Sequence, residues 1–296
     1  MNLKIILIFS LIFSGMINIK TTKAQIKIGV FADCQYCDCE TAGNRYYRNS
    51  LSKLSDCINN FNENKKIDFV IGLGDLIDRD FSSFAKVNSV LEESKKEVFH
   101  VTGNHDLSVE KESIDEVPKQ LNLKNTYYTF KKKDWQFIFL NGNEITFQST
   151  NPKVVEKAEK MVKQLTAEKK PNNKEWNGGM SNIQLEWMES EIQKAEKKNR
   201  KVMLFCHYPL LPFEAHALWN SEEVLAILKK YSCVKAWING HNHAGNYAME
   251  NGIHFITMKG MVDTKNKNAF SIVSLSNERI VVEGVGRETS RSLPLK

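Results

Sequence analysis

Short polar motifs close a series of apolar runs along the chain, and this alternation constrains the fold more than any other feature. Residues 26–31, 67–73 and 97–102 each have the length and composition of a buried strand. Between them, residues 45–61 and 84–94 indicate helices, and apolar residues in the first recur three and four apart, as on one helix face. Strand, helix, strand, helix, strand is typical of parallel crossover units, so this half of the chain predicts an α/β sheet.

The pattern changes after residue 125. Residues 126–130 and 135–140 flank a lysine-rich turn and predict an antiparallel hairpin. Residues 150–174 are rich in lysine and glutamate and predict a surface insertion that is helical in part. Two further apolar runs, 201–206 and 234–239, predict strands that end at histidine-containing motifs.

Two serines and three β-rich runs complete the organisation. Ser181 and Ser221 are the expected N-caps of two helices. The three short β-runs lie near residues 246–250, 253–259 and 269–285. No internal repeat or linker divides the sequence, so we expect one α/β domain with two sheets face to face and flanking helices.

The first 24 residues have the organisation of a secretory signal peptide. A basic start precedes the apolar stretch 5–17, and Thr22-Lys23-Ala24 offers a cleavage site before Gln25. The apolar stretch is too short to span a bilayer comfortably, although an uncleaved anchor is the alternative. We therefore expect residues 25–296 to form the mature domain, exported to the periplasm or the outside as a monomer, without stable membrane insertion after cleavage.

Charge and composition narrow the class of partner. The formal net charge is +6, but residues 1–24 hold three lysines and no acidic residue, which leaves 38 basic against 35 acidic residues. This balance is too mild to indicate nucleic-acid binding. Hydrophobic residues make up 42% of the sequence, so a buried core is expected.

Three of the six cysteines crowd the loop after the first predicted strand: Cys34, Cys37 and Cys39. Export permits disulfides, and a bridge from Cys37 or Cys39 to Cys57 is one alternative that the sequence leaves open. A zinc knuckle would need a second close cysteine pair, which the sequence lacks.

Five polar motifs supply oxygen and imidazole donors, each at the end of a predicted strand. They are Asp33-Cys34-Gln35, Gly74-Asp75-Leu76-Ile77-Asp78, Gly103-Asn104-His105-Asp106, His207 and Gly240-His241-Asn242-His243. Singly, each has an ordinary explanation as a turn, a helix cap or a core histidine. Ligands of α/β sheets bind at the carboxyl ends of strands, so together the motifs predict a two-metal hydrolase acting on a phosphoryl group.

A dinuclear centre needs one ligand shared by both ions. A carboxylate shares best because its two oxygens and its charge offset two adjacent cations, and Asp75 lies in the middle of the series. His241 and His243 are two residues apart, so on extended backbone their side chains share a face. Asn104 offers an amide oxygen after a glycine that permits a sharp turn.

The order of these motifs resembles the calcineurin-like metallophosphoesterases. That resemblance implies a four-layer α-β-β-α sandwich with two mixed sheets and a dinuclear metal centre. Further segments are similar to one branch, the manganese-dependent ADP-ribose/CDP-alcohol diphosphatases. These segments are residues 31–38, 176–179, 217–220, 240–245 and 284–291.

The resemblance implies two divalent ions, with manganese as the expected metal. The first ion would be held by Asp33, Gln35, Asp75 and His243. The second ion would be held by Asp75, Asn104, His207 and His241.

Two more residues have catalytic roles by this resemblance. His105 would contact the substrate phosphate or donate a proton, held by Asp106, because a neighbouring carboxylate raises the pKa of an imidazole.

Gln35 departs from the wider superfamily, where histidine is commoner. Its amide oxygen makes the first site oxygen-rich, which suits manganese better than zinc.

The expected partner is a small nucleotide, and the implied reaction is hydrolysis of ADP-ribose or CDP-alcohols by a hydroxide held between the metals. Candidate residues for the base are aromatic: Tyr36, Phe213, His216 and Trp219. Candidates for the ribose or a phosphate are Asn177, Gly178 and Gly179, presenting backbone amides, with Arg45 and Arg48 as weaker ones.

Two other functions remain open. One is a phosphodiesterase or phosphomonoesterase of the same superfamily with another substrate. The other is an exported metal- or nucleotide-binding protein without turnover. A degenerate binder would be expected to lose His105, which this sequence keeps.

Overall fold

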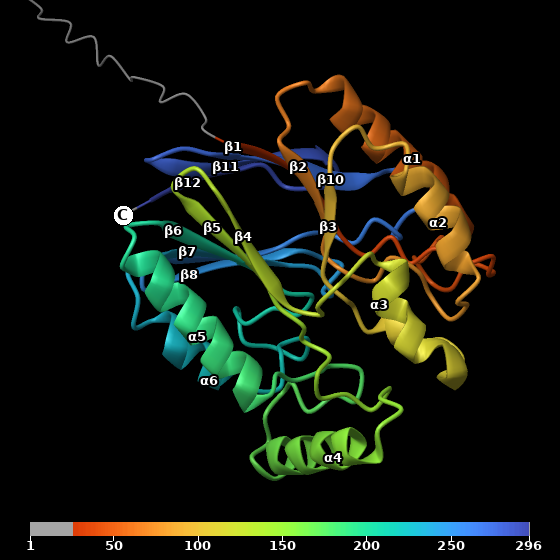
Figure 1. The fold of residues 1–296 in the computed structure, drawn as a ribbon. Helices are drawn as coiled ribbons and strands as arrows, with labels where there is room; N and C mark the ends of the chain where they lie inside the picture. The colour runs from red at the N-terminus through yellow and green to blue at the C-terminus, as the bar shows by residue number, and fades with distance from the viewer. Residues whose placement is uncertain (1–25, 296) are drawn as a thin grey trace, which may run out of the picture.

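Two six-stranded sheets pack face to face in the computed structural model, which describes residues 26–295, and helices cover their outer surfaces (Figure 1). Both sheets contain parallel and antiparallel pairs. The expected four-layer α-β-β-α sandwich with two mixed sheets is therefore confirmed.

The first sheet contains the N-terminal strands and the C-terminal tail. Its strand order is β12 (Arg291–Pro294), β11 (Arg279–Gly286), β10 (Ala269–Leu275), β1 (Ile26–Phe31), β2 (Phe69–Gly72), β3 (Val98–His100). Strands β1, β2 and β3 are parallel, so their carboxyl ends lie at one edge. Strands β10, β11 and β12 continue the sheet antiparallel.

The second sheet is built from the middle of the chain. Its order is β4 (Tyr128–Lys132), β5 (Trp135–Phe139), β6 (Lys201–Phe205), β7 (Val234–Asn239), β9 (Ile253–Thr257), β8 (Asn246–Glu250). The hairpin predicted from residues 126–140 is the antiparallel β4–β5 pair. Strands β5, β6, β7 and β9 are parallel, so β6 and β7 also end at a common edge.

Helices cover the two outer faces. On the first sheet these are α1 (Tyr47–Glu63) and α2 (Ser83–Leu91), and on the second α5 (Asn182–Glu196) and α6 (Ser221–Leu228). The predicted insertion contains α4 (Pro152–Ala167), which lies apart from the sheets at the bottom of Figure 1. Short α3 (Val117–Gln120) follows a 3₁₀ turn at Lys111–Glu116.

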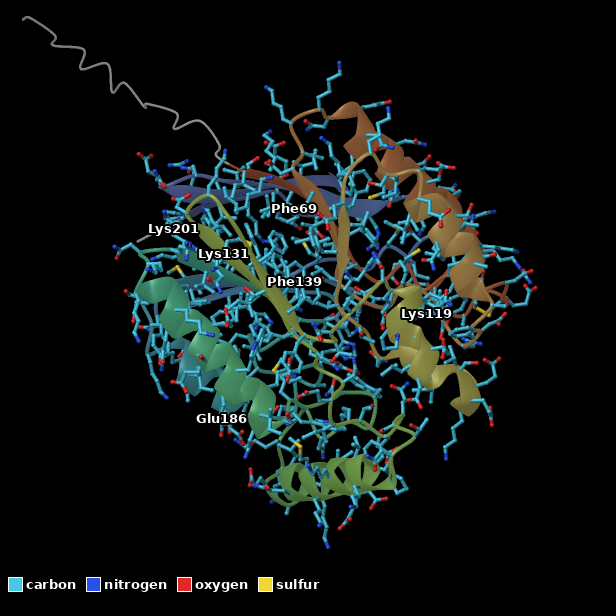
Figure 2. The ribbon with its side chains drawn as sticks, viewed as in Figure 1. Phe69, Lys119, Lys131, Phe139, Glu186 and Lys201 are labelled. Carbon is cyan, nitrogen blue, oxygen red and sulfur yellow. A yellow bond between two sulfur atoms is a disulfide. The ribbon has the colours of Figure 1, made fainter. Side chains whose placement is uncertain are left out.

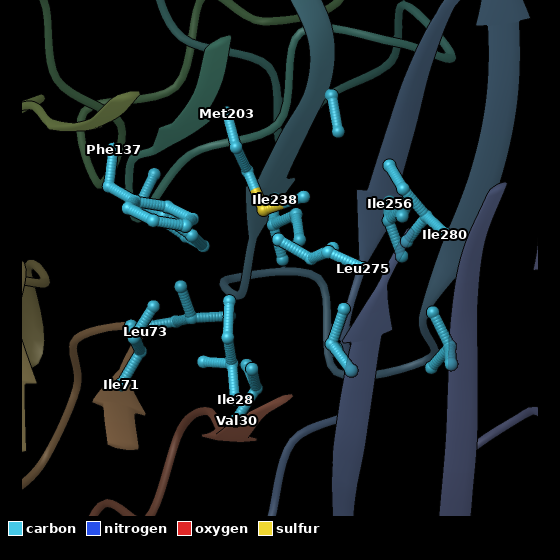
Figure 3. Close-up of a cluster of buried hydrophobic side chains, with 14 of the residues drawn as sticks. Ile28, Val30, Ile71, Leu73, Phe137, Met203, Ile238, Ile256, Leu275 and Ile280 are labelled. Atoms are coloured by element: carbon cyan, nitrogen blue, oxygen red, sulfur yellow. The ribbon is translucent and has the colours of Figure 1, made fainter. Parts of the chain in front are cut away.

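The main core lies between the two sheets. Ile28 and Val30 point inward to this core, whereas Phe31 faces α1 on the outer side, as strand alternation requires. Figure 3 shows the inward residues of the first sheet facing those of the second, and Phe69 and Phe139, which Figure 2 labels, belong to the same core. Each fully buried aliphatic or aromatic side chain contributes about 1.5–3 kcal/mol, which fixes the sheets and therefore their edges.

Several details differ from the sequence predictions. The run 269–285 forms two antiparallel strands, β10 and β11, because Ser276–Glu278 makes a turn, and the tail adds β12. Ser181 caps α5 by accepting a bond from the Gln184 N–H, as expected. The cap position of α6 is Asn220, one residue before the predicted Ser221.

The cysteines also pair differently from the alternative considered above. Cys37 and Cys39 form a disulfide, while Cys57 is a free, buried thiol.

The predicted signal peptide lies outside the described residues. Within residues 26–295, no helix combines the length and apolar content needed to cross a bilayer.

Candidate metal centre

The polar motifs of both sheets meet at one edge of the sandwich. The loops after β1, β2 and β3 carry Asp33, Asp75 and Asn104, and those after β6 and β7 carry His207 and His241. Backbone hydrogen bonds join these loops within and between the sheets, including Asp33 N–H to Gly74 O and Val262 N–H to Asp33 O. The first sheet thus supplies carboxylate and amide oxygens, and the second supplies imidazoles.

Two groups of side chains have the spacing of metal ligands. In each group the ligand atoms lie within 4.8 Å of one another: Asp75, His207 and His241 in one, and Asp33, Asp75 and His243 in the other. Asp75 belongs to both, which is the position predicted for the shared ligand. The two groups correspond to the two predicted ion sites, and ion binding by them remains a prediction.

The amide side chains extend both groups. Gln35 Nε2 lies 3.0 Å from Asp75 Oδ2 and 3.2 Å from His243 Nε2, and the buried Gln35 Oε1 has no hydrogen-bond partner among the described residues. Rotation of this amide about the Cγ–Cδ bond would place the unpaired Oε1 among the other candidate metal-ligand atoms. Asn104 Oδ1 lies 3.2 Å from His207 Nε2 in the other group. This convergence of acceptor atoms fits two divalent cations.

Backbone conformation at the site is unusual. Asp33, Gln35, Asp75 and His241 all have positive φ, at 52°, 46°, 54° and 70°. Non-glycine residues in this region cost of order 1–3 kcal/mol each and persist where the surrounding structure over-determines them. The buried sandwich supplies that constraint, and the result is a set of side chains aimed at a common point.

Gly103 permits the closest approach between two of these loops. A Cβ built at this position would contact both the backbone nitrogen and the Oδ1 of Asp75. Any side chain here would therefore displace the shared carboxylate. The glycine that precedes Asn104 is thus required by the packing of its loop against the β2 loop.

Each histidine is oriented by a bond from its other ring nitrogen. Nδ1 of His207 donates to Leu73 O at 2.8 Å, and Nδ1 of His243 donates to an oxygen of Asp263 at 3.0 Å. His241 uses Nε2, which lies 2.9 Å from Asn177 Oδ1. These bonds leave one nitrogen of each ring facing the centre, which is how metal-binding histidines are usually fixed.

Charge is divided unevenly among these buried groups. Burial opposes ionisation of Asp75, but the adjacent His207 and His105 outweigh it and hold the pKa of Asp75 well below its usual value. Burial would lower the pKa of His207, yet Asp75 raises it to about 9. Burial and the charge of His207 together lower the pKa of His241. Without metal, one proton therefore resides on His207, and a cation would compete with it.

The partner of His105 is Asp78, so the predicted role of Asp106 was wrong. His105 Nδ1 donates to Asp78 Oδ1 at 2.8 Å, and its Nε2 lies 3.5 Å from Arg45 Nη1. Burial lowers the pKa of His105, but Asp75 and Asp78 more than offset this and raise it. His105 is thus held by a carboxylate, as expected, beside a second cationic side chain.

Asp106 has a different function because the 3₁₀ turn at His105–Leu107 directs its carboxylate toward the β2 loop. Its oxygens accept four backbone N–H bonds, from residues 75, 76, 77 and 103. Burial raises the pKa of Asp106 to about 7, the charge of Asp75 adds to this, and the N–H donors oppose it. Asp106 is a positioning residue that joins the two loops carrying Asp75 and Asn104.

A cavity of about 540 Å³ opens beside the Asp75–His207–His241 group. Its lining combines two candidate ligands with polar and aromatic side chains: Asn104, His105, Ser108, Phe147, Gln148, Glu175, Trp176, His216 and His241. Other cavities, around residues 97–100 and 119–125, are lined by no residue of the five motifs. The cavity beside His241 is therefore the candidate substrate site.

Several substrate-binding predictions are contradicted. Tyr36 is 4% exposed and packs in the core beneath α1, and Trp219 is 3% exposed with its ring against Phe147. Neither is among the residues that line the cavity. Phe213 is also absent from the lining, whereas His216 is present. Arg48 pairs with Asp38 and Glu40 at the surface, whereas Arg45 reaches His105.

The Asn-Gly-Gly segment supports the site, and two of its three backbone N–H groups are not available to a ligand. The N–H groups of Asn177 and Gly179 donate to Lys174 O and Ile145 O, so they are already engaged. Gly178 accepts a bond from the Trp219 N–H. The side chain of Asn177 contacts His241, a role that the sequence did not indicate.

Three important residues were missed. Asp78 ends the motif that begins at Gly74, but the motif gives no sign of a contact with His105. Asp263 lies in a loop with no recognisable sequence signal. Trp176 directly precedes the Asn-Gly-Gly segment, which was the available clue. It is 42% exposed and lines the cavity.

Together, the two-sheet fold and the paired ligand groups define a dinuclear metal-dependent hydrolase. Residues 26–245 match the sequence model described as "Calcineurin-like phosphoesterase". The chain belongs to this family.

Similar proteins cover almost the whole chain. A protein of Xenopus laevis named manganese-dependent ADP-ribose/CDP-alcohol diphosphatase is 29% identical over 90% of this chain and 89% of its own length. A protein of the same name from Arabidopsis thaliana is 27% identical over 88% and 94%. A solved dimetal phosphatase from Danio rerio superposes with a TM-score of 0.82 over 93% of this chain and 100% of its own, and at 23% identity it shows the shared fold.

Proposed function

We propose that this protein hydrolyses the phosphoanhydride bond of ADP-ribose and CDP-alcohols, with two manganese ions held by the two ligand groups. This proposal rests mainly on the two ligand groups that share Asp75 and on the nucleotide-sized cavity beside them. Similarity to diphosphatases of that name over about nine-tenths of both chains supports the substrate class.

The predicted ligand sets are retained in this proposal. Asp33, Gln35, Asp75 and His243 would hold one ion, and Asp75, Asn104, His207 and His241 the other. Bound there, the ions would lower the pKa of water and neutralise phosphate charge. The amide oxygen of Gln35 makes its site richer in oxygen, which favours manganese over zinc.

His105 and Arg45 would act on the phosphate itself. Both side chains are cationic when His105 is protonated, and their nitrogens lie 3.5 Å apart. An anion between them would relieve the repulsion. Asp78 keeps His105 oriented and raises its pKa, so the imidazole can donate a proton to the leaving phosphate oxygen.

The substrate is tested with the purified mature protein and added Mn²⁺. ADP-ribose, CDP-choline, a cyclic nucleotide and p-nitrophenyl phosphate are compared by kcat/KM. We expect the two anhydrides to be preferred and Asp75→Asn to abolish turnover. A preference for the cyclic nucleotide or the monoester would overturn the substrate assignment and favour another phosphoesterase activity.

We further propose that the chain is exported as a monomer after cleavage before Gln25. The basic and apolar segments of residues 1–24 support this. The N-terminal sequence of protein recovered from culture medium or periplasm tests the cleavage. A full-length chain retained in the cytoplasm would contradict it.

A further inference from the structure

The cavity beside the candidate metal centre is lined by two chemically different kinds of side chain. Asn104, His105 and His241 are polar and belong to the motifs of the centre. Trp176, Phe147 and His216 supply aromatic rings. Its volume of about 540 Å³ is within the range of small-molecule sites. A ligand with a phosphate and a flat apolar part would match both kinds.

Trp176 is the most accessible of these rings. Its side chain is 42% exposed, and its ring centroid lies 5.0 Å from that of His216 and 5.2 Å from that of His241. Trp219, the neighbouring tryptophan of this region, is only 3% exposed. Trp176 therefore combines a free aromatic surface with proximity to a candidate metal ligand.

The backbone around Trp176 is firmly held. The next residue, Asn177, donates from Nδ2 to Asn172 O and Ala215 O, while its Oδ1 contacts His241. These bonds fix the backbone that carries the indole relative to His241. Such preorganisation reduces the entropy lost when a ligand stacks on the ring.

Glu175 lies at the edge of the same cavity. Its exposed carboxylate lines the cavity and has no hydrogen bond or ion pair among the described residues. A carboxylate accepts hydrogen bonds and donates none when ionised. Adenine and cytosine both carry an exocyclic amino donor, whereas uracil has a carbonyl in the position where cytosine has this group.

We propose that this cavity is a nucleobase subsite in which the base stacks on Trp176 and its amino group donates to Glu175. The inference rests on the proposed function, since a nucleotide substrate supplies the base. It explains how one site accepts both adenine and cytosine nucleotides. Phosphates would reach His105 and the adjacent Arg45.

Stacking is tested by equilibrium binding to the manganese-loaded mature protein. The affinity ratio of AMP over ribose 5-phosphate isolates the base. Trp176→Ala should reduce this ratio about tenfold, because stacking of a base on an aromatic ring has that magnitude. Trp176→Phe should keep most of it, and Ile183→Ala, at a residue 73% exposed, is the surface control. An unchanged ratio, including equal loss of both ligands, would overturn the stacking role.

Selectivity is tested with CMP and UMP on Glu175→Gln. We expect the preference for CMP to fall severalfold, because the amide also donates and so tolerates a carbonyl. Glu186→Gln, on the exposed face of α5, is the matched control. An undiminished preference for CMP would exclude Glu175 as the acceptor.

These results are separable from those of the turnover assay. If the wild type fails to cleave ADP-ribose and CDP-choline yet shows the Trp176-dependent AMP ratio, the proposed reaction fails and the subsite stands. If it cleaves both and the ratio is insensitive to Trp176, the reaction stands and the subsite fails.

Discussion

The replacement Gly103→Ala tests whether loop packing sets the metal centre. A Cβ at this position would lie 2.8 Å from Asp75 Cγ and closer still to two other atoms of Asp75. Ordinary contacts of this kind begin at 3.4 Å, so the carboxylate must recede by at least about 0.6 Å. One of the closer atoms is a backbone nitrogen, so rotation of the Asp75 side chain cannot remove the conflict.

The displacement can be compared with what a metal site tolerates. Ligand distances in metal sites hold to about 0.2 Å, at most a third of the required shift. We therefore expect both ions to bind at least tenfold more weakly and kcat/KM to fall about 100-fold, as small misplacements of catalytic groups do. Both ions are affected because Asp75 belongs to both groups.

Gly29→Ala is the matched control. A Cβ there would also lie 2.8 Å from a neighbour, but the neighbour is the ring of Phe61 on α1. This overpacking should lower the free energy of unfolding by about 1–3 kcal/mol and leave the metal content unchanged. Metal content by mass spectrometry and urea unfolding distinguish the two variants. Two tightly bound ions in Gly103→Ala would refute the reasoning.

Three further predictions follow from the electrostatics of the site. Asp78→Asn should lower kcat at least tenfold and shift the basic limb of the pH–rate profile to lower pH. The reason is that the variant lacks a carboxylate that raises the pKa of His105. An unchanged profile would exclude this role of Asp78. In metal-free protein the pKa of His207 is raised from 6.5 to about 9. The contribution of protonated His207 to the free energy of unfolding is therefore full below pH 6.5 and is lost as the pH rises through about 9. Metal displaces that proton, so the manganese-induced rise in Tm should be larger at about pH 8.5 than at about pH 6.5. Asp75→Asn should lose both ions together in a titration, whereas loss of one ion alone would show that Asp75 is not shared.

The strand-end residues could be predicted because parallel strands bring distant motifs to one edge. Asp33, Asp75 and Asn104 follow consecutive parallel strands, and His207 and His241 follow two more, so topology alone places them together. Geometry at this level requires only that the strands are parallel, which the alternation of strands with helices predicts.

Contacts that depend on loop direction could not be predicted. Asp106 is adjacent to His105 in sequence, but a 3₁₀ turn sends the two side chains apart, and Asp78 from another loop takes the place. Similarly, Trp219 is buried by Ile145 and the insertion helix α4, while Trp176 remains accessible. Composition does not distinguish the two tryptophans, because their exposure is set by packing between distant segments.

The division of ligands between the sheets has a consequence for biosynthesis. The candidate oxygen donors come from the first hundred or so residues, whereas the three candidate histidine ligands all follow residue 200. A nascent chain therefore has no complete ion site until about four-fifths of it has been synthesised. Cation capture must be one of the last events of maturation, in whichever compartment the polypeptide completes its folding.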